Sequence, residues 1–229
     1  ALVGLRFGEH ELIPETDLGP KVFAGTLLTP WPNRIQNGTY QFEGKQYQLE
    51  IRDGKGNALH GMVDEQRATV LETRTGYAKL ETFLVASEGY PANLRVESVF
   101  ELSATELTVS YQVTNQGPGN APVGIGTHPY FLYTDSTKIE INAKTAAVHD
   151  GQMIPIGEVQ ASELGLGPGR ASLVSNLKLD TQFGQLGDPV ATVTNDEFAY
   201  ILSEAGIECK RSDVENDGRK SFVIQRCPP

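Results

Sequence analysis

The feature that most constrains this chain is the recurrence of short segments in which apolar and polar residues alternate. Each segment is bounded by glycine, proline, asparagine or aspartate, and the 3.6-residue periodicity of long amphipathic helices is scarce. Alternation with a period of two is typical of β-strands. Because strand follows strand with little room for crossover helices, antiparallel pairing is the simplest arrangement. The sequence therefore predicts an all-β protein.

Three hairpins can be placed from their turn residues. The segment TYQFEGKQYQLEI turns at residues 43–45, ATVLETRTGYAKLETFLV bends at Thr75-Gly76, and LRVESVFELSATELTVSYQVTN turns near residues 103–105. A further strand is expected in TKIEINAKTAAVHD, residues 137–150. These segments supply the strands of the expected sheets.

The Gly/Pro-rich stretch LGLGPGRASL, residues 164–173, is the best candidate for a linker. It is short and β-like sequence resumes after it, so we interpret it as a loop within one domain that spans residues 1–229. Its glycines do not precede Lys-Ser or Lys-Thr, which argues against a phosphate-binding P-loop. The chain opens on the strand-like ALVGLRF and stops two prolines after SFVIQRC, so we expect it to be truncated at both ends.

Charge and cysteine content exclude several classes of function. The chain carries 19 basic and 29 acidic residues, and a net charge of −10 repels the phosphate backbone of nucleic acids. No apolar run approaches the ~20 residues that span a bilayer, so no membrane partner is expected. The two cysteines, Cys209 and Cys227, fit neither a metal site nor a disulfide framework and favour a cytoplasmic location. We expect no metal and no cofactor.

Two of the four histidines stand out as candidate functional residues. His10 and His149 lie in polar turns, where surface positions are expected, whereas His60 in GNALHGM and His128 in GIGTHPYF follow small or apolar residues at the end of an expected strand. A histidine at the rim of a β scaffold suits general acid catalysis or the binding of a polar ligand, because its pKa lies near neutrality. For each of the two, simple packing in the core stays equally open.

A rigid loop carries the third candidate. Arg34 follows the Pro-Trp-Pro segment of TPWPNRIQNGTY, in which the prolines fix the backbone. Its guanidinium can fork two hydrogen bonds to vicinal hydroxyls or to a carboxylate, and Trp31 can offer an apolar face to a sugar ring. A surface arginine beside a buried tryptophan is the alternative. Asp180, in LKLDTQFGQL, gains no role from spacing alone, and the absence of Gly-x-Ser-x-Gly weakens a serine hydrolase interpretation.

Five segments, taken in order, resemble the aldose 1-epimerase (galactose mutarotase-like) family: AGTLLTPWPNRIQNGTYQFEGKQYQL, ALHGMV, EGYPANLRVESVFEL, APVGIGTHPYF and LDTQF. The resemblance runs from about residue 24 to residue 226, and its specificity lies in the ordered set. It implies a single large antiparallel β-sandwich, often called a supersandwich, with an open sugar cleft across one face.

The resemblance also implies roles for individual residues. It makes Asn33, Arg34 and His60 ligands of sugar hydroxyls, His128 the general acid, and Asp180 a ligand of ring hydroxyls. The implied reaction interconverts the α and β anomers of a hexose or hexose phosphate. A carboxylate takes the proton of the C1 hydroxyl while His128 protonates the ring oxygen, so that the ring opens.

One position departs from the family pattern. The catalytic base of the family is a glutamate after a GR.S-like turn, and Gln225 stands at that position in GRKSFVIQRCPP. A neutral amide binds the C1 hydroxyl but cannot accept its proton. Three functions therefore stay open: an active aldose 1-epimerase, a non-catalytic carbohydrate-binding protein on the same fold, and a β-sandwich domain that accompanies a carbohydrate-processing enzyme. The sequence does not indicate an oligomeric state.

Overall fold

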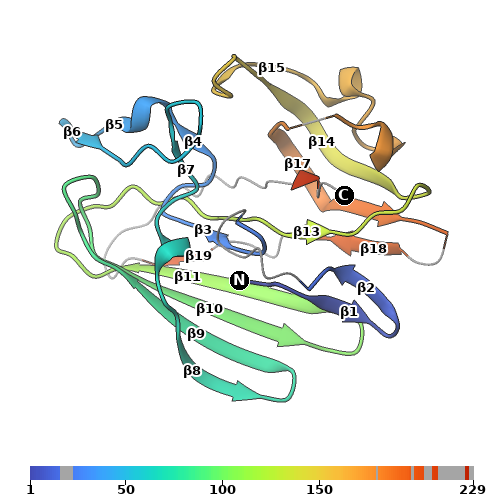
Figure 1. The fold of residues 1–229 in the computed structure, drawn as a ribbon, viewed down its shortest axis with the longest axis horizontal. Helices are drawn as coiled ribbons and strands as arrows, with labels where there is room; N and C mark the ends of the chain where they lie inside the picture. Colours follow the sequence, from blue (N-terminus) through green and yellow to red (C-terminus); the bar gives the residue numbers. More distant parts are fainter. Residues whose placement is uncertain (16–22, 179, 197–198, 204–207, 211–224, 227–229) are drawn as a thin grey trace.

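The structure of the protein is a computed structural model that describes residues 1–15, 23–178, 180–196, 199–203, 208–210 and 225–226 (Figure 1). Its strands are β1 (Leu5–Phe7), β2 (His10–Ile13), β3 (Leu27–Leu28), β4 (Arg34–Ile35), β5 (Thr39–Phe42), β6 (Lys45–Gln48), β7 (Ala58–Leu59), β8 (Thr69–Arg74), β9 (Tyr77–Leu84), β10 (Leu94–Leu102), β11 (Leu107–Asn115), β12 (Gly126–Thr127), β13 (Tyr130–Phe131), β14 (Lys138–His149), β15 (Pro155–Gln160), β16 (Ala171–Leu173), β17 (Phe183–Thr194), β18 (Ala199–Leu202), β19 (Glu208–Lys210) and β20 (Gln225–Arg226). The short 3₁₀ helices of the same residues are η2 (Gln36–Gly38), η3 (Val63–Glu65), η4 (Ala161–Leu164) and η5 (Val174–Asn176).

One sheet has the strand order β19-β11-β10-β9-β8. Its three long strands form antiparallel hairpins whose register places Leu94 opposite both Leu84 and Asn115. Alternate residues of β10 such as Leu94 and Val96 are buried, because successive side chains of a strand point to opposite faces. This sheet is the green layer in the lower part of Figure 1.

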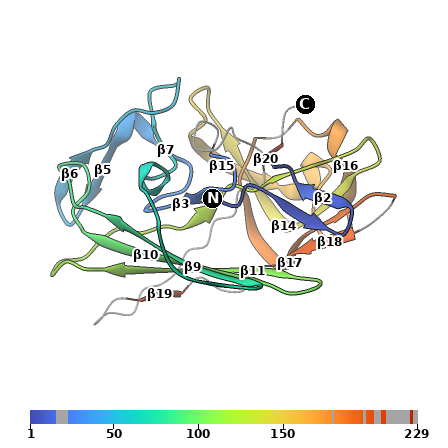
Figure 2. The same ribbon diagram turned by 60° about the horizontal axis from the view of Figure 1, so that its bottom comes forward.

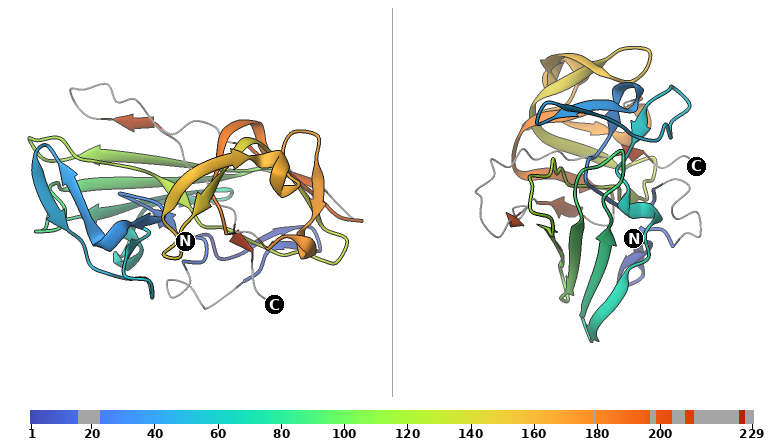
Figure 3. Two further views of the ribbon diagram at one scale, coloured as in Figure 1. Left: turned by 90° about the horizontal axis from the view of Figure 1, so that it is seen from above. Right: turned by 90° about the vertical axis from the view of Figure 1, so that its left-hand side faces the viewer.

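The second sheet has the order β15-β14-β17-β18, with β16 paired to one end of β14. Its central strands β14 and β17 are each 12 residues long and pair antiparallel, with an irregular register between Ile141 and Ala143. Figures 2 and 3 show this yellow and orange sheet as a layer distinct from the green one.

Short strand pairs lie between and beside the two sheets. They are β1-β2, β3-β12, β4-β7, β5-β6 and β13-β20. In Figure 1, β3 and β13 run through the region between the two sheets. The residues that follow β7 and β12 belong to this central region, and they include both candidate histidines.

Each sheet has its own buried apolar cluster. The cluster on the β8–β11 sheet comprises Leu27, Val63, Leu84, Tyr90, Ala92, Leu94, Val96, Val113 and Ile125. The cluster on the β14–β18 sheet comprises Ile139, Ile141, Ala143, Ala161, Leu166, Ala191 and Val193. Burial of these side chains is the main favourable contribution to folding.

The structure confirms the predicted all-β class and the three hairpins. Residues 43–44, 75–76 and 103–106 connect the paired strands, so Lys45 already belongs to β6. The predicted strand of residues 137–150 is β14. In the stretch 164–173, which the sequence predicts to be a loop, residues 165–170 connect η4 to β16, and the last three residues form β16 on the same sheet as β14. Antiparallel pairing dominates, but β19 pairs parallel to β11 and β20 parallel to β13. No helix among the described residues is long and apolar enough to cross a membrane.

Candidate active site

His128 follows β12 and is fixed by its backbone. Its N–H donates to the carbonyl of Thr26 at 3.1 Å, and its carbonyl accepts from the N–H of Gly25 at 2.8 Å. These bonds extend the antiparallel pair of β12 and β3 by the residue that bears the imidazole. The imidazole is therefore attached to a defined strand end, and only 2% of His128 is exposed.

His60 follows β7 and interlocks with Asn33. Both residues have left-handed backbone conformations, with φ of 62° for His60 and 61° for Asn33. The N–H of His60 donates to the carbonyl of Asn33 at 2.9 Å, and the N–H of Asn33 donates to Nδ1 of His60 at 3.1 Å. Because Nδ1 accepts a hydrogen bond, a neutral His60 carries its proton on Nε2. His60 thus presents an N–H donor.

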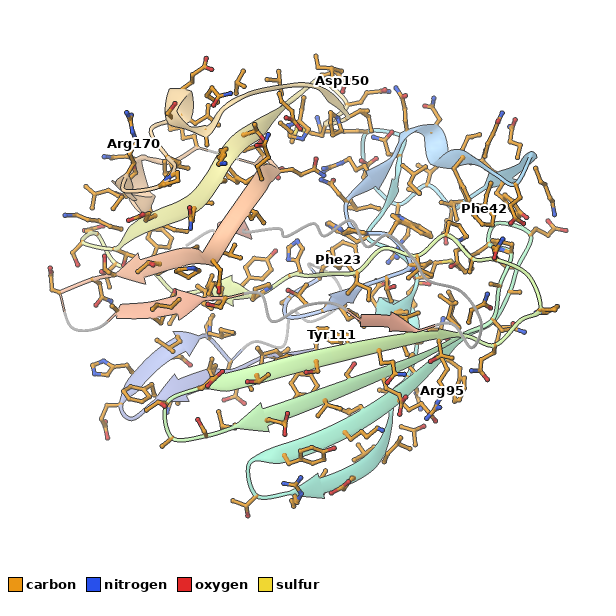
Figure 4. All side chains as sticks on the ribbon, turned by 180° about the vertical axis from the view of Figure 1, so that it is seen from behind. Phe23, Phe42, Arg95, Tyr111, Asp150 and Arg170 are labelled. Carbon is orange, nitrogen blue, oxygen red and sulfur yellow. The ribbon has the colours of Figure 1, made fainter. Side chains whose placement is uncertain are left out.

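The two imidazoles pack against each other within a group of rings. The ring centroids of His60 and His128 are 5.1 Å apart in an edge-to-face arrangement. The ring centroid of Phe23 lies 4.7 Å from that of His60, and the ring centroid of Tyr130 lies 5.3 Å from that of His128. Figure 4 shows Phe23 near the centre of the molecule, between the two sheets. Segments that are distant in sequence thus bring both candidate histidines into one cluster.

Burial favours the neutral form of both histidines. Loss of solvation is the main cause that lowers the pKa of His60 to about 3, and the charges of His128, Arg34 and Arg52 lower it further. Burial also lowers the pKa of His128, while a contact with its own backbone and the negative charge of Asp180 act in the opposite direction. The two histidines therefore feel different charges, since positive charges act on His60 whereas the carboxylate of Asp180 acts on His128.

His128 stands out in this cluster because both of its ring nitrogens are buried. Neither Nδ1 nor Nε2 has a hydrogen-bond partner among the residues that the structure describes. Buried polar groups are nearly always paired, and an exception calls for a functional explanation. The imidazole is therefore a candidate group for contact with a ligand.

Arg34 stands beside this cluster in a network of polar contacts. Its Nε donates to Oδ2 of Asp53 at 2.8 Å, and its Nη1 donates to Oδ1 of Asn33 at 3.3 Å. The backbone of Asn33 in turn holds His60. The guanidinium side chain is 17% exposed. The guanidinium of Arg34, the side-chain amide of Asn33 and the two imidazoles therefore lie in one continuous region.

The family model for aldose 1-epimerase matches residues 11–197. The chain belongs to this family. The protein YihR of Escherichia coli (strain K12) is 32% identical over 204 residues, which cover 86% of this chain and 66% of YihR. Galactose mutarotase of Bos taurus is 31% identical over 149 residues, which cover 60% of this chain and 42% of that protein. The chain thus spans less than two thirds of the length of either relative.

Solved structures show the same fold. The GalM/aldose epimerase homologue from C. elegans has a TM-score of 0.71 at 17% identity, covering 82% of this chain and 65% of that one. A galactose mutarotase-like protein from Clostridium acetobutylicum has a TM-score of 0.70 at 19% identity, covering 84% and 68%. The fold of this aldose 1-epimerase family member is accordingly the galactose mutarotase-like all-β sandwich.

Of the residues assigned by family resemblance, four lie in one region. Asn33, Arg34, His60 and His128 belong to the network described above. Asp180 is exposed, and its charge is close enough to act on His128. Their roles in sugar binding and catalysis stay predictions.

The expected position of the catalytic base is only partly described. The backbone of Gln225 pairs with that of Tyr130, two residues after His128. The segment in which the family has its glutamate therefore lies beside the strand that follows the proposed acid. The side chain of Gln225 lies outside the described part of the chain.

Three residues of the region were missed by the sequence analysis. Phe23 and Tyr130 contribute rings, and Asp53 holds Arg34. Asp53 has a local signal in DGKGN, since an aspartate before glycines favours a turn that its own carboxylate stabilises. Among the residues with a described placement, no group of three or more His, Cys, Asp or Glu side chains is arranged to hold a metal ion.

Proposed function

We propose that the chain carries the sugar site of an aldose 1-epimerase that interconverts the anomers of a hexose. The observation that supports this most is the state of His128. It is 2% exposed, both ring nitrogens are without a hydrogen-bond partner in the described residues, and its ring packs on His60. The imidazole of His128 can donate and accept a hydrogen bond, and Nε2 of His60 is a fixed donor beside it. This combination suits the ring oxygen and hydroxyls of a sugar.

In the proposed reaction, His128 gives a proton to the ring oxygen while a base takes the proton of the C1 hydroxyl. The bond between C1 and the ring oxygen breaks and leaves the open-chain aldehyde. Rotation about C1–C2 and closure on the other face give the other anomer, with both proton transfers reversed. The acid form in this proposal is the imidazolium of His128. Burial lowers its pKa, which makes the imidazolium a stronger acid but reduces the fraction that carries the proton at neutral pH, and the charge of Asp180 raises that fraction.

Binding of the substrate falls to the neighbouring donors in this proposal. His60 offers its Nε2 proton, and Arg34 and Asn33 offer donors to vicinal hydroxyls. Asp180 accepts hydrogen bonds from ring hydroxyls. The substrate is a free hexose or a hexose phosphate, and the small number of cysteines supports a reducing, cytoplasmic setting.

A second candidate function is sugar binding without turnover. It is favoured by Gln225, because an amide at the position of the base cannot accept the C1 proton. Both functions use the same donors, so binding alone does not separate them.

Polarimetry with freshly dissolved α-glucose, α-galactose and α-glucose 6-phosphate separates the two functions. An epimerase accelerates the approach to the equilibrium rotation for at least one of these sugars. Saturable binding by calorimetry without acceleration would support the binding protein, and Gln225→Glu should then create activity. Absence of both binding and acceleration for all three sugars would refute both functions.

A further inference from the structure

We propose that Asp53 is a positioning residue that holds the guanidinium of Arg34 in place for the sugar, an inference that rests on the proposed function. The Nε of Arg34 donates to Oδ2 of Asp53 at 2.8 Å, and the carboxylate is 5% exposed. An ion pair so shielded from solvent is screened much less than a surface pair. Asp53 does not contact the histidines in this assignment and acts through Arg34.

The carboxylate of Asp53 is itself held in place by its own turn. Oδ1 accepts from the backbone N–H of Lys55 at 2.9 Å and of Asn57 at 2.7 Å. Oδ2 accepts from Nδ2 of Asn57 at 3.1 Å in addition to Arg34. With four donors on two oxygens, both the position and the rotation of the carboxylate are defined.

Asn57 connects this turn to two other segments. It is fully buried, its Oδ1 accepts from the N–H of Asn37 at 3.2 Å, and its Nδ2 donates to the carbonyl of Gln152 at 3.0 Å. Lys55 adds a bond from Nζ to the carbonyl of Gly151 at 3.0 Å. The carboxylate that holds Arg34 is thus fixed relative to η2 and to the connection between β14 and β15.

The contacts of Arg34 define what remains for a ligand. Nε is used by Asp53 and one N–H of Nη1 by Asn33, so the described contacts use two of the five N–H donors of a guanidinium. Asp53 therefore occupies the Nε donor of Arg34 and orients the two terminal nitrogens, Nη1 and Nη2. A guanidinium that is already ordered loses little side-chain entropy when it binds hydroxyls, and this preorganisation favours affinity. We do not assign Asp53 as the catalytic base, because its two oxygens already accept four hydrogen bonds.

The test compares Asp53→Asn with a matched variant, Glu97→Gln. Glu97 is also a buried carboxylate that holds an arginine, with Arg95 Nη2 at 2.9 Å from Oε1, but it lies on the β8–β11 sheet (Figure 4 labels Arg95). We expect Asp53→Asn to raise KM about 5- to 50-fold with kcat changed less than about 3-fold, because the lost contacts bind substrate and transition state alike. Glu97→Gln should leave both constants unchanged.

A double-mutant cycle shows whether the effect passes through Arg34. In an Arg34→Ala background, Asp53→Asn should raise KM no further. Two results would overturn the inference without affecting the proposed function. One is an unchanged KM in Asp53→Asn, and the other is an equal rise in KM when Asp53→Asn is introduced into the Arg34→Ala variant. A wild-type protein that neither binds nor converts sugar would instead overturn the proposed function, and with it the role of Asp53 toward a sugar.

Exchange of the arginine Nε protons with water gives a readout that needs no sugar. In the wild-type protein the Nε proton of Arg34 should exchange at least ~10-fold more slowly by NMR than that of Arg6, whose side chain is 70% exposed. If Asp53→Asn folds, it should remove this protection. Equal exchange at Arg34 and Arg6 in the wild type would contradict the hold of Asp53 on Arg34.

Discussion

At the scale of single residues, His128 has features that favour chemistry over stability. Its imidazole is almost fully buried, yet neither ring nitrogen is hydrogen-bonded within the described residues. An unsatisfied buried polar group costs about 1–3 kcal/mol. His60, in contrast, is held by Asn33 through both its backbone and its ring. The pair thus combines one fixed donor with one imidazole whose ring nitrogens the described residues leave unpaired.

Replacement of His128 by leucine should separate stability from sugar binding. We expect His128→Leu to unfold at the same or higher urea concentration than the wild type, because it removes two buried polar atoms for which the described residues supply no partner. The same variant should bind sugar more weakly by calorimetry. His149→Leu, at the end of β14, is the control that should leave sugar binding unchanged. A loss of more than about 2 kcal/mol of stability in His128→Leu would contradict this assignment.

Stability should fall as the pH is lowered below about 6.5, the ordinary pKa of histidine. The folded-state pKa of His60 is about 3 and that of His128 is also lowered, so the unfolded chain takes up these protons first. The contribution is fully present above pH 6.5 and is lost, for His60, progressively down to about pH 3. Each histidine contributes a slope of up to about 1.4 kcal/mol per pH unit.

Urea unfolding at pH 7 and pH 5 checks this dependence, because most carboxylates remain ionised in this interval. The wild type should lose stability, and His60→Asn should lose less between the two pH values. Equal stability of the wild type at pH 7 and pH 5 would show that the histidines are not kept neutral.

The sequence predicted part of this site for local reasons. His60 and His128 could be distinguished from His10 and His149 by their small and apolar neighbours at strand ends. The contacts of Asp53 with Arg34 and of Phe23 with His60 could not be predicted, because they depend on pairing across 19 and 37 residues of chain. Left-handed conformations at Asn33 and His60 are likewise set by tertiary contacts, since L-residues rarely adopt them unaided.

At the scale of elements, the turn after β7 depends on Gly61. This glycine has φ of 79° and lies against Thr29, to which it is bridged in parallel orientation. A Cβ atom on Gly61 would overlap the carbonyl oxygen of Thr29. The glycine therefore permits the close approach that brings His60 beside Asn33.

Gly61→Ala should disturb both stability and the site. We expect a loss of more than about 3 kcal/mol by urea unfolding, because backbone atoms of Thr29 must move. Gly56→Ala is the matched control, since Gly56 has φ of 89° in the same segment but no atom within 4 Å of its Cβ position. This control should cost only about 1–2 kcal/mol for the left-handed backbone. Equal losses in the two variants would refute the steric explanation.

The hairpins were predictable because their signals are local. Glu43-Gly44 and Thr75-Gly76 mark turns whose strands pair with their sequence neighbours. The parallel pairs β11-β19 and β13-β20 join segments that are distant in the chain, and strand alternation alone does not specify a partner. The fold class thus follows from the periodicity, whereas the position of the strand that bears Gln225 does not.

At the scale of the whole molecule, two apolar clusters support two sheets, and the site lies in the segments between them. A loop of the second sheet contributes to its cluster: Leu166, inside the Gly/Pro-rich stretch, is fully buried. The interpretation of this stretch as a loop is compatible with that burial, because a single apolar anchor fixes a loop whose glycines supply the bends.

Leu166→Ala should therefore cost about 2–5 kcal/mol of unfolding free energy, because it leaves a cavity in a packed core. Leu164→Ala, at a half-buried position two residues earlier, should cost clearly less. Chemical denaturation of both variants provides the comparison. A loss below about 1 kcal/mol for Leu166→Ala would show that the stretch is not anchored to the sheet.

The exchange of α and β anomers at equilibrium, followed by two-dimensional NMR exchange spectroscopy, tests the central claim most directly. With galactose or glucose as substrate, the wild-type protein should accelerate the exchange, and His128→Gln should reduce the acceleration about 10²- to 10⁴-fold, the usual contribution of a general acid. An undiminished acceleration in His128→Gln would contradict the assignment of His128 as the acid of an aldose 1-epimerase.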